Sequence, residues 1–96
     1  MKIRKYELVL VSGEGCIYCQ MSKDLLNEEG LGYRTVDYKT FPRFKEDNHL
    51  TIPQLYLYNR SNGDYEFIEG GYEGLLKEVD MVREKLHEEF EEDIAI

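Results

Sequence analysis

The pattern of apolar and polar positions in the first third of the chain predicts a strand, a helix and a second strand. Four consecutive aliphatic residues end the segment Tyr6 to Val11, which is typical of a strand buried on both faces of a sheet. After a turn at Ser12 to Gly15, apolar residues recur at helical spacing between Ile17 and Asn27, and Gly30 is placed to stop that helix. The β-branched and aromatic stretch Tyr33 to Tyr38 then completes a βαβ unit.

The second half of the chain predicts a hairpin and a long helix. Gln54 to Tyr58 and Tyr65 to Ile68 have strand composition, and the Asn-Gly signal between them is typical of a tight turn. Gly70-Gly71 then interrupts the secondary structure. Apolar residues then recur every three or four positions from Tyr72 to Phe90, which predicts a helix of more than four turns packed on the sheet. The acidic run Glu88 to Asp93 is expected to fray.

These elements indicate an α/β fold made of a βαβ unit, a β-hairpin and a C-terminal helix. Pro42 suits the first turn of a short helix running through Lys45 to Asn48, with Thr40 as a possible cap. We expect a single domain over residues 1–96, because a chain of that length supports one hydrophobic core.

Charge is distributed unevenly along the chain. The formal net charge is -8, yet residues 1–60 carry 9 Lys/Arg and 8 Asp/Glu, whereas residues 61–96 carry 3 and 12. An acidic chain without a basic cluster argues against nucleic-acid and anionic-membrane partners. The longest strongly apolar run, Leu8 to Val11, is too short to span a bilayer. We therefore expect a cytoplasmic protein.

Cys16 and Cys19 are the candidate chemical centre. They follow the buried strand and begin the first helix, where unpaired backbone N–H groups favour a thiolate and lower the pKa of a cysteine. Cys19 lies one turn further along, close enough to form a disulfide with Cys16. Cys16 would then attack a disulfide, and Cys19 would resolve the mixed disulfide.

Two other interpretations of this pair are possible. A structural zinc would need two more ligands, and His49 and His87 are the only histidines, at spacings unlike those of a zinc finger. The thiols could also be inert. The βαβ context favours redox chemistry over both.

Three ordered motifs extend this prediction: Cys16-Ile17-Tyr18-Cys19, Thr51-Ile52-Pro53-Gln54 and Gly70-Gly71-Tyr72-Glu73. Together they resemble the glutaredoxins of the thioredoxin superfamily, in a dithiol form similar to short phage or archaeal members. The resemblance covers nearly the whole chain. It implies a thioredoxin-like fold with a four-stranded mixed sheet flanked by helices.

The resemblance also implies a glutathione site. The proline at position 53 would be cis and face the dithiol, and the backbone of Ile52 would pair with the cysteinyl part of glutathione. Gly71, Tyr72 and Glu73 would receive the γ-glutamyl end. Tyr18 matches the tyrosine of the usual active-site motif, and Lys23 matches a lysine commonly found in the same helix.

Three departures from the family pattern bear on this prediction. Ile17 replaces the usual proline between the cysteines, which makes iron-sulfur binding easier to accommodate in this family. Gly13 falls where many members have a Lys or Arg that holds the glycine end of glutathione, and Arg43 or Lys45 could supply a substitute. Glu73 replaces a common Asp or Thr, and the stretch from Asp37 to Thr51 is shorter than in typical bacterial members.

The sequence thus predicts an enzyme that reduces protein disulfides and glutathione mixed disulfides, with glutathione as reductant and no tightly bound cofactor or metal. Ribonucleotide reductase is one possible substrate, and a monomer is expected. The alternatives are a thioredoxin-like reductant recycled by a reductase and a glutaredoxin dimer that holds a [2Fe-2S] cluster. Because glutathione is anionic, we expect most of the acidic residues on the outer face of the final helix, away from Cys16.

Overall fold

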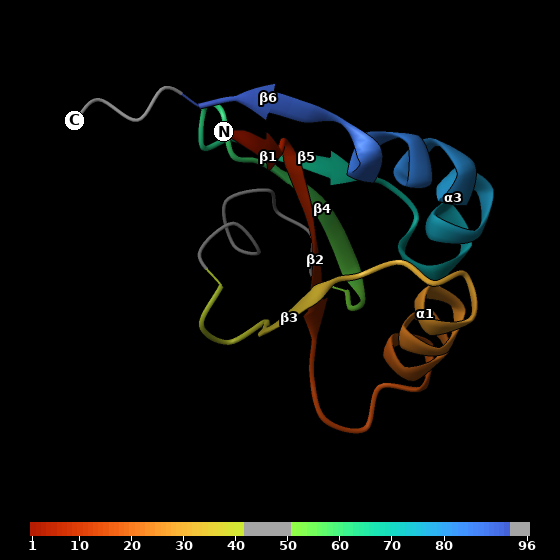
Figure 1. Cartoon of the computed structure of the whole chain (residues 1–96). Helices are drawn as coiled ribbons and strands as arrows, with labels where there is room; N and C mark the ends of the chain where they lie inside the picture. The colour runs from red at the N-terminus through yellow and green to blue at the C-terminus, as the bar shows by residue number, and fades with distance from the viewer. Residues whose placement is uncertain (42–50, 93–96) are drawn as a thin grey trace.

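A mixed sheet with the strand order β3-β2-β4-β5 forms the centre of the molecule (Figure 1). The computed structural model describes residues 1–41 and 51–92. In the sheet, β2 (Tyr6–Ser12) runs parallel to β3 (Arg34–Asp37) and antiparallel to β4 (Gln54–Asn59), which pairs antiparallel with β5 (Tyr65–Ile68). The predicted βαβ unit, hairpin and four-stranded mixed sheet are confirmed.

Two helices cover one face of this sheet, as Figure 1 shows: α1 (Ile17–Glu28) and α3 (Gly71–His87). Alternate residues of β2 and β4 face them because side chains of a strand point to opposite faces in turn. Each buried leucine stabilises the fold by about 1.5–3 kcal/mol. The core on this face contains Leu8, Leu10, Leu55 and Leu57 from the strands, Leu26 from α1, and Leu75 and Val82 from α3.

The opposite face of the sheet is aromatic. Tyr56 is fully buried, and its ring centroid lies 5.3 Å from those of Phe41 and Phe67. Tyr65 packs edge-on against the Phe41 ring, also at 5.3 Å. The tyrosines of the hairpin that lie on this face are therefore explained by packing.

The two ends of the described chain form a second, two-stranded sheet that the sequence did not predict. β1 (Lys2–Arg4) pairs antiparallel with β6 (Glu89–Glu91). The register sets Ile3 opposite Phe90, between two facing pairs of opposite charge. Such cross-strand pairs stabilise a sheet. The expectations that the helix continues to Phe90 and that the acidic run frays are therefore wrong for residues 88–91.

The end of α3 explains this error. Glu88 caps the helix with an extended backbone (φ -66, ψ 140), and its carbonyl accepts a hydrogen bond from the Lys5 N–H at 2.8 Å. The chain therefore leaves the helical path one residue after His87. Phe90 keeps its helical spacing in the sequence, but in the structure it belongs to a strand.

Some predictions fall outside the described residues. They are the short helix from Pro42 through Lys45 to Asn48, the substitute cations Arg43 and Lys45, and His49. Within residues 1–41 and 51–92, no helix has the length and apolar character needed to cross a bilayer.

Candidate functional site

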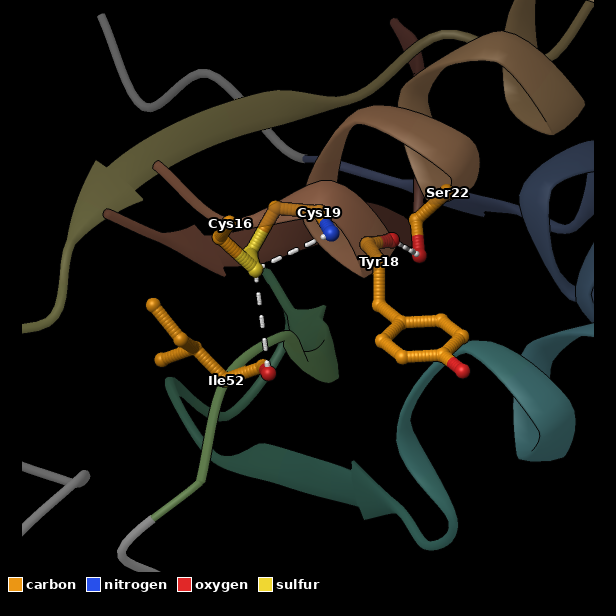
Figure 2. The surroundings of a disulfide bond; sticks show 5 residues. All are labelled: Cys16, Tyr18, Cys19, Ser22 and Ile52. Atoms are coloured by element: carbon orange, nitrogen blue, oxygen red, sulfur yellow. Dashed lines mark hydrogen bonds between the residues drawn. A yellow bond between two sulfur atoms is a disulfide. The ribbon is translucent and has the colours of Figure 1, made fainter. Parts of the chain in front are cut away.

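The two cysteines are joined in a disulfide at the start of α1, directly after the loop that follows β2 (Figure 2). Their Cα atoms are 5.2 Å apart. Cys19 is only 1% exposed, whereas Cys16 is half-buried. An incoming sulfur atom can therefore approach Cys16 more easily than Cys19.

The helix start stabilises negative charge on the Cys16 sulfur. Cys16 is the N-cap of α1, in an extended conformation, and its Sγ accepts a hydrogen bond from the backbone N–H of Cys19 at 3.1 Å. Gly15, with φ +69, forms the turn directly before this N-cap residue. A sulfur at this position faces the positive end of the helix dipole, which favours a thiolate.

The Ile52–Pro53 peptide faces the dithiol from the start of β4. Its bond is cis, as the resemblance implied. Figure 2 shows the Ile52 carbonyl directed at Cys16, with its oxygen 3.8 Å from Sγ. Because a disulfide sulfur carries no proton, this contact becomes a hydrogen bond only when Cys16 is a reduced thiol.

A glycine corner, formed by Gly70, Gly71 and Gly74, brings the start of α3 against Pro53. Gly70 and Gly71 have φ angles of +96 and +58, in the left-handed region that favours glycine. A Cβ atom on Gly71 would lie 3.3 Å from the Pro53 carbonyl oxygen, and one on Gly74 would lie 1.7 Å from the Glu69 carbonyl oxygen. Two of these glycines belong to the predicted motif, whereas Gly74 was missed because nothing in helical periodicity marks it.

A groove of about 500 Å³ runs from Tyr18 to the glycine corner. Tyr18 is 57% exposed, and its ring centroid lies 6.2 Å from that of Tyr72. The groove therefore brings together all six residues predicted for glutathione: Tyr18, Ile52, Pro53, Gly71, Tyr72 and Glu73. It is also lined by Thr51, Gln54, Phe67, Glu69 and Gly70.

Two carboxylates line this groove. Glu69 and Glu73 are both exposed there, and they are exceptions to the expectation that most of the acidic residues lie away from Cys16. The reason is the glycine corner, which turns the end of β5 and the first turn of α3 toward Pro53. Glu73 was predicted for the site from the family motif, whereas Glu69 was not. Other carboxylates of α3, such as Glu78 and Glu84, are exposed and do not line the groove.

A second hollow lies on the other side of the disulfide. It includes both cysteines together with Gly13, Gln20 and Lys23, so the predicted lysine does lie beside the dithiol. A Cβ atom on Gly13 would come within 2.8 Å of Ile52 Cδ1 and 2.9 Å of the Tyr38 ring, so these side chains would have to shift to admit a residue larger than glycine.

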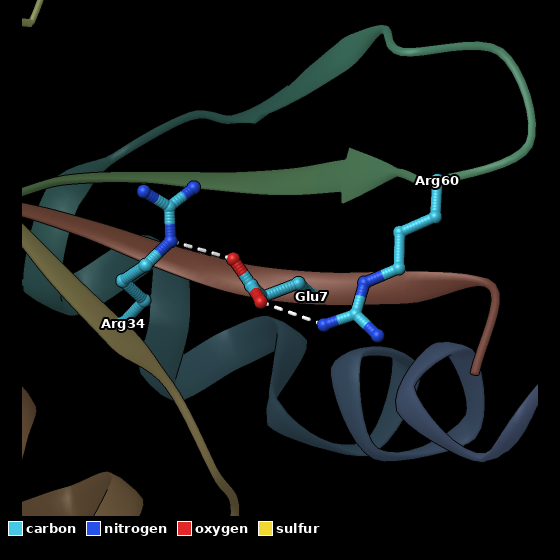
Figure 3. Close-up of polar contacts among 3 residues, drawn as sticks. All are labelled: Glu7, Arg34 and Arg60. Atoms are coloured by element: carbon cyan, nitrogen blue, oxygen red, sulfur yellow. Dashed lines mark hydrogen bonds and ion pairs between the residues drawn. The ribbon is translucent and has the colours of Figure 1, made fainter. Parts of the chain in front are cut away.

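A carboxyl with a shifted pKa lies at the other end of β2. Glu7 is bridged by Arg34 and Arg60, each at 2.6 Å (Figure 3). Burial alone would raise the pKa of Glu7, but hydrogen bonds and charges from the two arginines outweigh it and hold the pKa below the usual value. The hydrogen bond to Glu7 raises the pKa of Arg34 in turn. This ion pair stabilises the sheet and is not part of the dithiol site.

The described part of the chain contains no group of three His, Cys, Asp or Glu side chains arranged to hold a metal ion. His87, one of the two histidines considered as zinc ligands, lies at the end of α3, where its Nδ1 is 3.2 Å from Arg4 Nη1. It does not line either hollow beside the cysteines.

Comparison with known proteins supports the fold. No family model matches the sequence, and no curated protein matches it. Solved structures do: a buckwheat glutaredoxin–glutathione complex matches with a TM-score of 0.63 and 20% identity, over 84% of this chain and 76% of that one. A glutaredoxin from Brucella melitensis has a TM-score of 0.59 and 18% identity, over 88% and 91% of the two chains.

A third structure, described as "Metal Binding of Glutaredoxins", has a TM-score of 0.56 and 21% identity, over 86% of this chain and 90% of that one. The three likenesses cover most of the chain. The protein therefore has the glutaredoxin fold, an α/β fold of the thioredoxin-like class, as its sequence motifs predicted.

Proposed function

We propose that this protein is a glutaredoxin-type thiol-disulfide oxidoreductase, with Cys16 as the nucleophile and Cys19 as the resolving thiol. One observation carries the proposal: a cysteine pair at the start of a helix, close enough to form a disulfide, faces the Ile52 carbonyl. Inert structural thiols would not require one sulfur to be accessible and to accept a hydrogen bond from a backbone N–H group.

The reaction is a transfer of two electrons by thiol-disulfide exchange. The reduced Cys16 thiolate attacks one sulfur of the substrate disulfide, and the other sulfur leaves as a thiolate that takes up a proton. The Cys19 thiolate then attacks Cys16 Sγ, which releases the second substrate thiol and forms the Cys16–Cys19 disulfide. Two glutathione molecules reduce that disulfide and leave as oxidised glutathione.

Glutathione is the proposed reductant because the groove offers the right backbone groups. Ile52 presents a carbonyl beside Cys16, and the first turn of α3 presents unpaired N–H groups at Tyr72 and Glu73 that suit a carboxylate. We propose that the cysteinyl part pairs with Ile52 and that the γ-glutamyl end lies at Gly71 to Glu73. The buckwheat glutaredoxin with a similar fold was solved as a complex with glutathione, which supports glutathione as the ligand.

A coupled assay tests the proposal. Reduction of a glutathionylated peptide is followed with glutathione, glutathione reductase and NADPH, for the wild type and for Cys16→Ser and Cys19→Ser. We expect Cys16→Ser to lose turnover completely and Cys19→Ser to retain turnover of the glutathionylated peptide while losing reduction of an intramolecular protein disulfide. Equal tolerance of the two substitutions would contradict the assigned roles.

The same assay separates the alternative of a thioredoxin-like reductant. If thioredoxin reductase and NADPH support turnover and the glutathione system does not, the recycling step is assigned wrongly although the dithiol chemistry stands. For the alternative of a cluster-binding dimer, anaerobic reconstitution followed by a visible absorption spectrum gives the answer. A colourless monomer excludes that alternative.

We also propose a setting for this activity. The protein would act as a cytoplasmic monomer on protein disulfides, with the disulfide of ribonucleotide reductase as one candidate substrate. The last proposal rests on the resemblance to short phage and archaeal glutaredoxins. Reduction of the oxidised reductase by this protein and glutathione, measured as deoxyribonucleotide formed, tests it directly.

A further inference from the structure

The groove near the disulfide and the hollow around the two cysteines differ in the charge of their described lining. The groove toward the glycine corner contains the carboxylates Glu69 and Glu73, and no Lys, Arg or His of the described residues lines it. The hollow on the other side contains Lys23 and no carboxylate. A neighbouring hollow that also contains Lys23 is lined by Glu14 and Asp37. The charge around Lys23 is therefore mixed, whereas the described charged residues of the groove are both carboxylates.

The two groove carboxylates have no side-chain partner among the described residues. Neither makes an ion pair or a side-chain hydrogen bond with residues 1–41 or 51–92, whereas Glu7, Glu29 and Glu91 are each paired with a cation. The Glu69 and Glu73 side chains are exposed. Their charge is thus available to a ligand.

The start of α3 does not cancel this charge. A helix N-terminus carries about half a positive elementary charge, which attracts anions. Glu73 lies in the first turn of α3 and offsets that charge with a full negative one, and Glu69 adds a second. The charged side chains that line the groove, among residues 1–41 and 51–92, therefore give it a net negative charge even though it ends at a helix N-terminus.

The aromatic wall of the groove also suits a cation. Tyr18 and Tyr72 lie with their ring centroids 6.2 Å apart, and Tyr18 exposes 57% of its surface. The face of a tyrosine ring attracts a guanidinium or ammonium group, and the attraction adds to that of nearby carboxylates. An arginine or lysine side chain would find both kinds of partner in the same groove.

From these observations we infer that the favoured substrates are protein disulfides in which the target cysteine has a lysine or arginine within one or two residues. The basic side chain would lie in the groove, near Tyr18 and between the two carboxylates. This inference rests on the proposed function and specifies its substrate class. It also implies that anionic glutathione is a weaker ligand of the groove than a basic peptide is.

The test compares peptides that differ only in charge. Each peptide has one cysteine in a mixed disulfide with mercaptoethanol, flanked by two lysines, two serines or two glutamates. The reduced protein is mixed with each peptide, and the second-order rate constant is divided by that of dithiothreitol with the same peptide. This division removes the effect of the flanking charges on the intrinsic reactivity of the disulfide.

We expect the lysine peptide to react roughly tenfold faster than the glutamate peptide at about 0.02 M salt, and the ratio to fall below about threefold at 0.5 M because salt screens the carboxylates. The double variant Glu69→Gln/Glu73→Gln should reduce the low-salt ratio to about twofold. The matched control is Glu78→Gln, which removes one exposed charge of α3 outside the groove and should leave the ratio unchanged.

The outcomes separate this inference from the function on which it rests. If the protein reduces no peptide faster than Cys16→Ser does, the proposed function fails. If it reduces all three at equal normalised rates, or if the ratio survives in the double variant, the function stands and the assigned specificity is wrong. Because the readout is a ratio, a general loss of activity in the double variant would not imitate the expected result.

Discussion

Replacing Gly74 by alanine tests whether the glycine corner builds the groove. A Cβ atom there would lie 1.7 Å from the Glu69 carbonyl oxygen and 2.7 Å from its carbon, where 3.4 Å is the start of ordinary contact. Both atoms belong to the backbone, so no side-chain rotation relieves the overlap. The end of β5 and the first turn of α3 must move apart.

Two opposing effects set the magnitude of this change. Alanine favours a helix over glycine by about 1 kcal/mol. Overpacking costs about 1–3 kcal/mol, and an overlap of this size with rigid backbone belongs at the upper end of that range. We therefore expect Gly74→Ala to lower the free energy of unfolding by about 2 kcal/mol, the difference between the two effects.

Urea unfolding followed by circular dichroism measures this loss. The matched control is Gly32→Ala, in the loop before β3, where a Cβ atom meets nothing within 4 Å. The control should change the free energy of unfolding by less than about 0.5 kcal/mol. Gly74→Ala as stable as the wild type, or more stable, would refute the reasoning, because helix propensity would then outweigh the contact.

The same variant should separate binding from chemistry. The corner supplies Gly71, Tyr72 and Glu73 to the groove, whereas Cys16 is held by α1. We expect the KM for a glutathionylated peptide to rise several-fold, while reaction with a small disulfide reagent that does not occupy the groove keeps its rate. Equal losses in the two reactions would show that the corner also positions the dithiol.

Three further predictions concern stability and the site. Glu7→Gln should lower the free energy of unfolding by up to about 1 kcal/mol at pH 7. Because the pKa of Glu7 is lowered in the folded state, its contribution to the free energy of unfolding is present above the unfolded pKa of 4.5 and is lost as the pH falls through the folded pKa. The free energies of unfolding of the wild type and the variant, measured by urea titration, should therefore converge at about pH 2.5. A difference that stays constant with pH would contradict this. Leu75→Ala should cost about 2–5 kcal/mol, because its side chain is fully buried, and Leu76→Ala, 49% exposed on the same helix, should cost much less. Gly13→Arg should destabilise the protein by about 1–3 kcal/mol through contact with Ile52, without lowering the KM for glutathione. A lower KM in the glutathione assay would show that the missing cation, and not packing, governs this position.

Long periodic elements could be predicted from the sequence, and short paired ones could not. The aliphatic run of β2 and the helical spacing of α3 each carry a signal over many residues. The three-residue strands β1 and β6 carry none, since each is defined by a partner more than 80 positions away. Helical periodicity therefore predicts that α3 continues to Phe90. In the structure, Phe90 instead pairs with Ile3 in a sheet.

The candidate site could likewise be predicted only in part. The cysteine spacing and its place after a buried strand predicted the dithiol on physical grounds, whereas the cis Ile52–Pro53 bond came from the family resemblance. The position of Glu69 in the groove could not be predicted from the sequence, because it depends on a turn whose direction is set by two glycines in the left-handed region. Charge counted along the sequence showed how acidic the last third is, but not where two of its carboxylates lie.

In the proposed reaction, Cys16 supplies the sulfur that attacks a substrate disulfide. The most direct measurement uses reduced Cys19→Ser and reduced Cys16→Ser, each mixed with oxidised glutathione, quenched with iodoacetamide and analysed by peptide mass spectrometry. We expect a glutathionyl group on Cys16 in the first variant and an iodoacetamide-alkylated or unmodified Cys19, without glutathione, in the second. A glutathionyl group that forms on Cys19 as fast as on Cys16, or on neither cysteine, would contradict it.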